Sequence, residues 1–415
     1  MNRRDFMRAA ALAGLFCTAP AIAAESSEQK KEVVPPFVKW TVGPYLQNPS
    51  ATAMTICFVS DHAQDVSAVV KNASEVDRVS HSATATPIPG TSATMWKVRL
   101  TDLKGGTEYR YNLEYKVDDK PVVEKQYHFK TPASDTDTMR CILLNDVHNR
   151  TGTAEAVMKH VAADDYEFTI LLGDCWTDPS WNGDGRKIMT TLAELVRVLN
   201  GAEKPILYVR GNHECRGYFS GKMGYLFDLP GLDPAASYYE QNFHFSYPAG
   251  PVWFLFNDAG EDGDKRKDKF EPYRQRQSKW IESEIKKPEY RAAKYHIFAS
   301  HIPLYNVNYW SAKYCRGFWS PVLAEADIDL ALGAHDHQWR VLEKDCICVN
   351  DKCENYNKAG TGQKRCPHSP PYPLVIGGGP SLKQGTVMVL KADSKKVSLR
   401  MLNTAGKTLV QSEVR

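Results

Sequence analysis

The chain has 415 residues, which is long enough for two domains and a sizeable hydrophobic core. Its 52 basic and 49 acidic residues are interspersed and leave a formal net charge of +3. This balance excludes the strongly basic footprint of a nucleic-acid-binding protein or of a protein that binds anionic membrane surfaces. No internal apolar run approaches the roughly 20 residues that a transmembrane helix requires.

The first 24 residues, MNRRDFMRAAALAGLFCTAPAIAA, have the plan of an export signal. A basic start, an apolar middle and an Ala-x-Ala-like end are typical of a segment that is removed and takes no part in the fold. The stretch from Arg3 to Arg8 resembles a twin-arginine signal, although an ordinary secretory signal can also carry two arginines. We therefore expect a mature protein that starts near Ala24 or Glu25, in the periplasm or outside the cell.

The next stretches predict a linker and an all-β domain. Residues 25–36 are polar and end in two prolines, as a linker does. Across residues 37–133, segments such as TAMTICFVS and MWKVRLTDL alternate apolar and polar side chains, which indicates half-buried strands. In LKGGTEYRYNLEY, Tyr109 and Tyr111 follow a glycine turn and resemble the tyrosine corner of an immunoglobulin-like or fibronectin type III sandwich. We predict such a β-sandwich here and expect no catalytic residue in it.

After PASDTD at 132–137, apolar strands alternate with amphipathic helices. The predicted strands are RCILLND (140–146), FTILLGD (168–174), PILYVRGNHE (205–214), VWFLFND (252–258), KYHIFASH (294–301) and IDLALGAHDH (328–337). The predicted helices cover residues 153–165, 186–200 and 274–287. This alternation predicts an α/β domain, which we place at residues 138–415, with helices packed on largely buried sheets.

Residues that commonly bind metal ions follow five of these strands. They are Asp146 with His148, Asp174, Asn212 with His213, His301, and His335 with His337. Sites in α/β folds form beyond the carboxyl ends of the strands, and loop residues two apart can converge on one ion. Each motif alone is weak evidence for a metal site, and a single histidine such as His301 more often has a structural role than a ligand role. Together, in order and at strand ends, they predict a metal centre.

This set of motifs resembles that of the calcineurin-like metallophosphoesterases. The matching segments are DVH at 146–148, GD at 173–174, GNHE at 211–214, SH at 300–301 and HDH at 335–337. The resemblance spans residues 138 to about 400 and implies an αββα sandwich of two mixed sheets flanked by helices. The sandwich domain in front is similar to the arrangement in the purple acid phosphatases.

The resemblance also implies two metal ions. The ligands of one ion would be Asp146, His148, Asp174 and His337, and those of the other would be Asp174, Asn212, His301 and His335. Asp174 would thus bridge the pair. Imidazole and carboxylate ligands suit manganese, iron(II) or zinc better than calcium, and the sequence does not choose among those three.

The activity implied is hydrolysis of a small-molecule phosphate ester. A hydroxide that bridges the two ions would attack, and His213 would protonate the leaving group as general acid. Asn212 and His213 would also contact the substrate. The domain order favours a phosphomonoesterase. The alternatives are a phosphodiesterase or nucleotide hydrolase of the same fold, and a non-catalytic surface or glycan-binding protein that retains the fold.

The chain departs from the purple acid phosphatases at two positions. Their first motif lacks the histidine found at His148, and they place an iron(III)-binding tyrosine where this chain has Thr177. A purple iron centre is therefore not expected. Some relatives place an aspartate three residues after the bridging one to orient the catalytic histidine. Here Asp178 comes four residues after it, and its role stays unassigned.

Several polar residues near the motifs allow more than one interpretation. Arg210, Arg216 and Arg340 could bind a phosphate, although a surface charge is the more common role of any one of them. Glu214 is expected to brace its loop by hydrogen bonds. The charged stretch EDGDKRKDKFEP at 261–272 is most simply a solvated loop.

A polar insert at about 341–372 follows the last motif. Its cysteines are Cys346, Cys348, Cys353 and Cys366. Export makes disulfides possible, and two pairings remain open because a bridge between Cys346 and Cys348 would close a strained ring. A structural zinc site is the alternative. The insert is either a lid or specificity element, or a disulfide-stapled surface excursion.

Overall fold

The computed structural model describes residues 41–74, 76–180, 186–262, 267–305, 310–345 and 370–414. The predicted export signal at 1–24, the linker at 25–36 and the four cysteines of the insert lie outside the described residues. They therefore stay predictions, as do the domain boundaries. None of the described helices combines the length and apolar composition that crossing a membrane would take.

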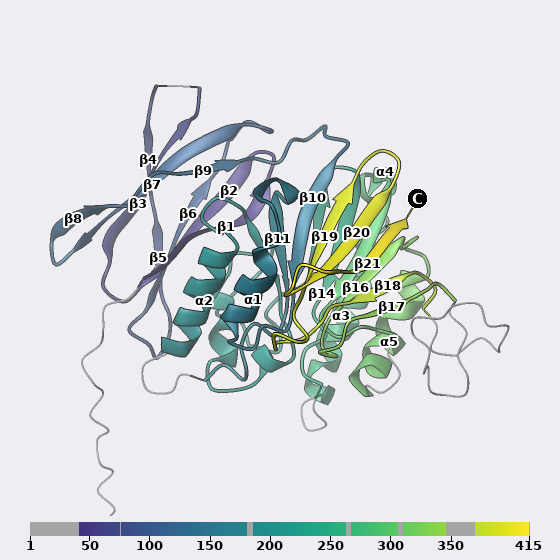
Figure 1. Ribbon diagram of the computed structural model, residues 1–415. Helices are drawn as coiled ribbons and strands as arrows, with labels where there is room; N and C mark the ends of the chain where they lie inside the picture. Colours follow the sequence, from purple (N-terminus) through teal and green to yellow (C-terminus); the bar gives the residue numbers. More distant parts are fainter. Residues whose placement is uncertain are drawn as a thin grey trace, which may run out of the picture. The chain divides into compact units, whose positions relative to one another are not determined.

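The N-terminal strands form two antiparallel sheets (Figure 1). The strands are β1 (Thr41–Ser50), β2 (Ala53–Ser60), β3 (Gln64–Asn72), β4 (Val79–Ser82), β5 (Thr84–Pro87), β6 (Thr94–Leu100), β7 (Glu108–Val117), β8 (Lys120–Val123) and β9 (Tyr127–Lys130). One sheet has the order β1-β2-β6-β5, and the other has the order β4-β3-β7-β8 with β9 paired to β7. Alternate residues, such as Phe58 and Leu113, fill the core between them. The predicted all-β sandwich is confirmed.

The two tyrosines of the predicted corner have different partners. The Tyr109 hydroxyl accepts a hydrogen bond from the backbone N–H of Lys104 at 2.8 Å, which ties down the preceding turn as a tyrosine corner does. The Tyr111 hydroxyl instead donates to the carbonyl of Ala202, at 2.6 Å, in the following domain. One tyrosine therefore stabilises the sandwich, and the other fastens it to its neighbour.

The C-terminal domain contains two mixed sheets. The first has the order β12-β11-β10-β19-β20-β21, with β10 (Met139–Leu144), β11 (Phe168–Leu172), β12 (Ile206–Val209), β19 (Thr386–Ala392), β20 (Val397–Asn403) and β21 (Thr408–Val414). The second has the order β13-β14-β15-β16-β18-β17, with β13 (Phe245–Ala249), β14 (Val252–Asn257), β15 (Tyr295–Ser300), β16 (Leu330–Gly333), β17 (Arg340–Leu342) and β18 (Leu374–Ile376). A single apolar core that includes Leu171, Leu390, Phe254 and Val375 joins both sheets.

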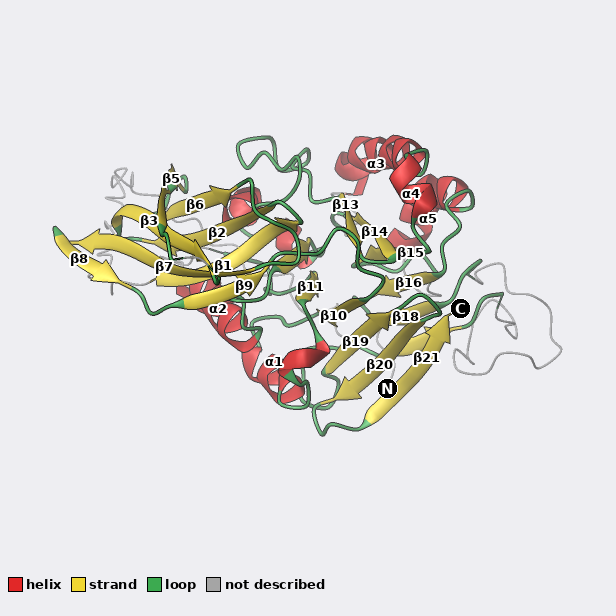
Figure 2. Ribbon diagram, turned by 90° about the horizontal axis from the view of Figure 1, so that it is seen from above, coloured by secondary structure: helices red, strands yellow, loops and turns green. Residues whose placement is uncertain are grey.

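Helices cover both outer faces of this pair of sheets. They are α1 (Thr151–Met158), α2 (Arg186–Val198), α3 (Glu271–Glu284), α4 (Pro288–Ala292) and α5 (Trp310–Leu323), with short 3₁₀ helices at Ala163–Asp165, His213–Cys215, Ser220–Leu226 and Lys267–Phe270. Figure 2 shows α1 and α2 on the side of the first sheet and α3, α4 and α5 on the side of the second. Ile281 of α3 and Trp319 of α5 pack with Leu255 and Phe298 in a second core. The αββα architecture is therefore confirmed.

The described residues belong to one compact unit, and polar contacts join its two domains. Asp228 accepts hydrogen bonds from Thr55 Oγ1 at 2.7 Å and from Asn48 Nδ2 at 3.2 Å. Its other carboxylate oxygen lies 3.2 Å from Lys97 Nζ. The Tyr45 hydroxyl donates to the carbonyl of Leu226 at 2.7 Å. The sandwich is thus fixed to the second domain by directional bonds.

Candidate metal centre

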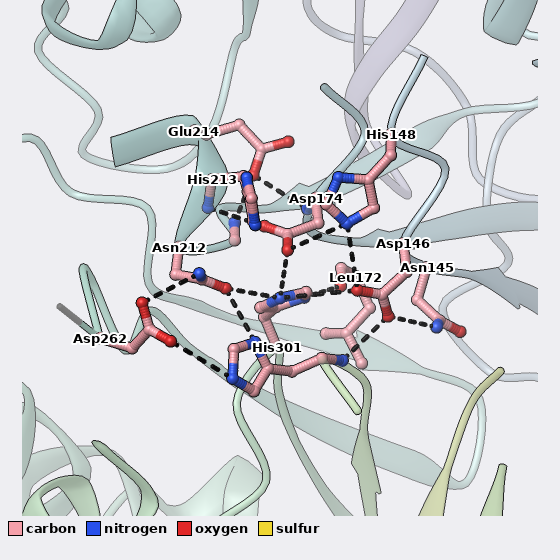
Figure 3. Close-up of polar contacts among 12 residues, drawn as sticks. Asn145, Asp146, His148, Leu172, Asp174, Asn212, His213, Glu214, Asp262 and His301 are labelled. Atoms are coloured by element: carbon pink, nitrogen blue, oxygen red, sulfur yellow. Dashed lines mark hydrogen bonds and ion pairs between the residues drawn. The ribbon is translucent and has the colours of Figure 1, made fainter. Parts of the chain in front are cut away.

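The strand ends predicted to carry ligand residues meet in one place (Figure 3). β10, β11 and β12 belong to the first sheet, and β15 and β16 belong to the second. The carboxyl ends of all five strands deliver polar side chains to the same edge of the two-sheet core, as expected for a site in an α/β fold.

The backbone of the site residues is mostly left-handed. The φ angles are 48° at Asp146, 47° at His148, 52° at Asp174, 73° at His335 and 54° at His337. Asp, Asn and His tolerate this region better than other L-residues, and such conformations cluster at functional sites. Two backbone hydrogen bonds hold the turns together: Asp146 N–H to Gly173 O at 3.1 Å and His148 N–H to Asp174 O at 2.9 Å.

A first group of side chains consists of Asp146, His148, Asp174 and His337, whose ligand-type atoms all lie within 4.8 Å of one another. His148 Nε2 is 3.0 Å from His337 Nε2 and 3.5 Å from Asp174 Oδ2. His337 Nε2 is 3.3 Å from Asp146 Oδ1. Two imidazole nitrogens and two carboxylate oxygens therefore surround one small space.

A second group shares Asp174 with the first and adds His301 and His335. His301 Nε2 lies 3.1 Å from Asp174 Oδ2. The amide oxygen of Asn212 faces both histidines, at 3.1 Å from His301 Nε2 and 2.9 Å from His335 Nδ1. The structure thus gathers all seven expected metal ligands into two adjoining groups, with Asp174 common to both.

The hydrogen bonds behind these side chains orient their ligand-type atoms toward the two spaces. His301 Nδ1 donates to the carbonyl of Leu172 at 2.7 Å, so Nε2 is the ring nitrogen that faces Asp174. Asp146 Oδ2 accepts hydrogen bonds from Asn145 Nδ2 and His335 N–H, at 2.7 and 2.9 Å. Oδ1 of Asp146 is buried and accepts no hydrogen bond from the residues that the structure describes. Outer contacts of this kind typically orient metal ligands, and the donor set suits divalent cations.

The charges of the cluster lead to the same conclusion. Burial alone would raise the pKa of Asp174, but the neighbouring His301 holds it at about 2. Burial alone would lower the pKa of His301, but Asp174 and Asp146 raise it to about 10. Two buried carboxylates therefore stay ionised and hold a proton on His301. Buried charges require partners, and metal ions would supply that positive charge directly.

Thr177 and Glu214 brace the cluster from outside. Thr177 Oγ1 lies 3.2 Å from Nδ1 of His148, on the side of the ring that faces away from the carboxylates. Glu214 is buried and accepts backbone N–H bonds from Asp174, Cys175 and Gly211, at 2.9, 2.6 and 2.9 Å. The expected bracing role of Glu214 is therefore confirmed. A side chain at Gly211 would place its Cβ 2.2 Å from Asp174 Oδ1, so the backbone needs glycine there.

His213 lies beside the first group and has a carboxylate partner. Its Nδ1 is 2.7 Å from Asp178 Oδ1, and its backbone N–H donates to Asp174 Oδ1 at 2.9 Å. The ring packs edge-on against His148, with centroids 4.6 Å apart. Asp178, which the spacing left unassigned, is therefore the partner of His213. It has a left-handed backbone with φ of 45°, which a spacing rule does not anticipate.

The first two residues of the stretch at 261–272, Glu261 and Asp262, are not simply part of a solvated loop. Glu261 is 2% exposed and accepts three hydrogen bonds from Arg216, two from Nε at 2.9 and 3.0 Å and one from Nη2 at 2.8 Å. Asp262 accepts from Arg216 Nη2 at 2.5 Å and from Asn212 Nδ2 at 3.1 Å. Sequence reasoning missed both carboxylates because a run of charges normally indicates exposure. Their partner Arg216 is also distant in the sequence.

The other two arginines near the motifs pair with side chains outside the group of ligand residues. Arg210 is buried and donates from Nε to Asp258 Oδ2 at 2.8 Å. Its interpretation as a surface charge is wrong. Arg340 donates to Asp336 Oδ2 at 3.2 Å and to Gln338 Oε1 at 3.0 Å. Of the three, Arg216 is the one that contacts His213, with Nη1 at 3.2 Å from Nε2.

A family model and several solved structures are similar to this chain or to parts of it. Residues 139–339 match the family model for calcineurin-like phosphoesterases. The structure is similar to that of a purple acid phosphatase from yellow lupin (Lupinus luteus) seeds, with a TM-score of 0.63, 15% identity and coverage of 90% of this chain and 74% of that chain. A human third fibronectin III domain matches 28% of this chain and 96% of its own length, with 12% identity and a TM-score of 0.14. No curated protein sequence matches the chain.

These observations define the class of protein. Residues 139–339 are a calcineurin-like phosphoesterase domain, preceded by a β-sandwich, and the fold of the described residues is similar to that of a purple acid phosphatase. The protein is accordingly a phosphoesterase, a hydrolase of phosphoric esters, with a buried cluster of histidines and aspartates that can hold metal ions.

Proposed function

We propose that this protein is an exported phosphomonoesterase that works with two divalent metal ions. Asp146, His148, Asp174 and His337 would hold one ion, and Asp174, Asn212, His301 and His335 would hold the other. The two adjoining groups of ligand-type atoms support this division, because Asp174 belongs to both. Two divalent ions bound there would acidify water and stabilise negative charge on the phosphate oxygens.

The observation that carries the proposal is the position of His213 between Asp178 and the cluster. Its backbone N–H holds Asp174, and its Nδ1 is engaged by Asp178 at 2.7 Å. Nε2 is therefore the ring atom that can carry a proton to the leaving group. General acid catalysis of this kind contributes typically about 10²–10⁴-fold to the rate. Asp178 would stabilise the charged ring and fix its orientation.

The donor set narrows the proposed metals to three and does not choose among them. Four imidazole nitrogens, two carboxylates and an amide oxygen suit manganese, iron(II) or zinc. Thr177 contacts the outer nitrogen of His148 and offers no phenolate, so the proposal does not include a purple iron(III) centre.

Preference for monoesters is supported by the overall likeness to a protein named as an acid phosphatase. The test compares p-nitrophenyl phosphate with bis(p-nitrophenyl) phosphate, after metal analysis of the protein. We expect both ions to be bound and the monoester to be the faster substrate. Faster hydrolysis of the bis-ester would make the enzyme a phosphodiesterase. A fully metallated protein inactive on a broad panel of esters would favour a binding role.

The proposed export rests on the first 24 residues of the sequence. Expression of the full chain in a bacterial host, followed by fractionation and N-terminal sequencing, tests it. We expect a protein outside the cytoplasm that begins near Ala24 or Glu25. A cytoplasmic protein that keeps Met1 would contradict the proposal.

A further inference from the structure

We propose that Arg216 is a substrate-binding residue that forms, together with His213, a two-donor site for an oxygen of the phosphate ester. The inference rests on the proposed function and adds to it a residue outside the set of metal ligands. Nε2 of His213 and Nη1 of Arg216 lie 3.2 Å apart, at the edge of the cluster.

The guanidinium of Arg216 is held rigidly by two carboxylates. Its Nε and Nη2 donate to Glu261, and Nη2 also donates to Asp262. Glu261 is buried, and Asp262 is tied to Asn212 at 3.1 Å. Because Nε and Nη2 are both occupied, the plane of the guanidinium is fixed. The donor that it presents toward His213 is therefore Nη1.

The position of Nη1 is informative because His213 must itself be a donor when it acts as an acid. In the acid form Nε2 bears a hydrogen, and two N–H groups cannot hydrogen-bond to each other. An oxygen in front of both groups would accept a hydrogen bond from each. Since Nε2 delivers its proton to the leaving group, that oxygen is the ester oxygen itself or a phosphate oxygen next to it. Arginine is the side chain best suited to such directional contacts with phosphate.

The side chains around Arg216 indicate that it binds the substrate through directional hydrogen bonds more than through its net charge. Three carboxylates lie around Arg216: Glu261, Asp262 and Asp178, whose Oδ1 is 3.8 Å from Nη1. The positive charge is therefore compensated before substrate binds. Arg216 therefore contributes an Nη1–H group that points in a fixed direction. A lysine cannot reproduce this direction, because its stem is flexible and its ammonium group is compact.

The experiment compares Arg216→Lys and Arg216→Gln with the wild type. The matched control is Arg197→Gln, because Arg197 is an exposed arginine on α2 that also pairs with two carboxylates, Glu194 and Glu155. The measurements are kcat and KM for p-nitrophenyl phosphate, the Kd of inorganic phosphate by calorimetry, the metal content and the unfolding midpoint. We expect both Arg216 variants to lose about 10- to 100-fold in kcat/KM, the range of one hydrogen bond to a charged group. Metal content should stay unchanged, and Arg197→Gln should behave as wild type.

Weaker phosphate binding by the Arg216 variants would support the contact even if the wild type hydrolysed no ester, so the calorimetry separates this inference from the proposed function. Unchanged activity and unchanged phosphate affinity in both variants would overturn it. Loss of metal or of folding in both variants would also overturn it, since Arg216 would then be structural. Asp262→Asn removes one restraint and keeps the guanidinium. It should show a smaller loss than Arg216→Gln, and an equal or larger loss would assign the effect to Asp262 instead.

Discussion

The two sides of the site are built differently. The metal cluster rests on strand ends, and the side chains of Asp146, Asp174 and His301 are at most 1% exposed. Its members are Asp146, His148, Asp174, Asn212, His301, His335 and His337. The acid side comprises Asp178, His213, Arg216, Glu261 and Asp262. It rests on loops and on the 3₁₀ helix His213–Cys215, and the side chains of His213 and Arg216 are 23% and 28% exposed. Sheet geometry therefore fixes the cluster, whereas ion pairs between side chains fix the acid side. Changes in the cluster should affect metal binding, and changes on the acid side should affect turnover.

The largest effect should come from Asp174, the one carboxylate that belongs to both groups. Asp174→Asn keeps the size of the side chain but removes a charge that both ions would share. Loss of an outer-shell contact alone typically costs about 10- to 100-fold in metal affinity, so loss of the shared ligand should cost more. We expect both ions to be lost on dialysis, measured by elemental analysis, together with all measurable hydrolysis.

The matched variant on the acid side is Asp178→Asn, which makes the same chemical change and should keep both ions. If Asp174→Asn and Asp178→Asn bound equal amounts of metal, metal binding would not distinguish the metal cluster from the acid side.

The second largest effect should come from His213→Ala. Removal of the proposed general acid should lower kcat by about 10²–10⁴-fold, while both ions stay bound. Steady-state kinetics together with metal analysis checks this. His128→Ala, at a 65% exposed histidine of the sandwich, is the control and should leave kcat unchanged. Unchanged turnover in His213→Ala would remove that histidine from the mechanism.

The residues that the sequence singled out at strand ends lie together in the structure, for a physical reason. Each ligand residue follows its own apolar strand, and the carboxyl ends of such strands meet at one edge. The β-sandwich and the packing of helices on buried sheets followed from periodicity, whereas the αββα arrangement of two sheets was implied by the family resemblance. Helix α5 was not predicted, because aromatic residues, Gly317 and Pro321 give the stretch WSAKYCRGFWSPVL a weak helical signal. Packing of Trp319 and Cys315 into the second core compensates for that weak propensity.

The acid side was predicted only in part. His213 lies inside the GNHE motif and was found with it. Its partner Asp178 was not assigned, because the expected spacing after Asp174 was three residues. The actual spacing is four residues, and Asp178 has a left-handed backbone. The pairing of Arg216 with Glu261 joins residues 45 positions apart and leaves no local pattern. Long-range ion pairs of this kind depend on how loops pack against one another. The periodicity of a single sequence carries no information about that packing.

A smaller effect should come from Asp178→Asn, measured this time as turnover. Asp178 is half exposed, so water screens its interaction with His213. We expect kcat to fall by roughly 10-fold, near the lower end for a charged hydrogen bond. KM should stay close to the wild-type value, because Asp178 orients the acid and does not touch the substrate. A rise in KM with kcat unchanged would show instead that Asp178 belongs to the substrate-binding surface.

The smallest effect on catalysis should come from Asp228, which lies outside both sides of the site, at the contact with the sandwich. Burial alone would raise its pKa, but Lys97 and hydrogen bonds from Thr55 and Asn48 lower it below its usual value. A carboxyl whose pKa is lower in the folded state stabilises the fold above the pKa of the unfolded chain, near 4, and that contribution is lost as the pH falls through the folded value. Asp228→Asn should therefore reduce the free energy of unfolding by about 1–2 kcal/mol at neutral pH. The difference from wild type should shrink in acid, as denaturant titrations at several pH values would measure, and kcat should not change. A change in kcat would mean that the sandwich contact influences the site, and the separation between the metal cluster, the acid side and the rest of the fold would then fail.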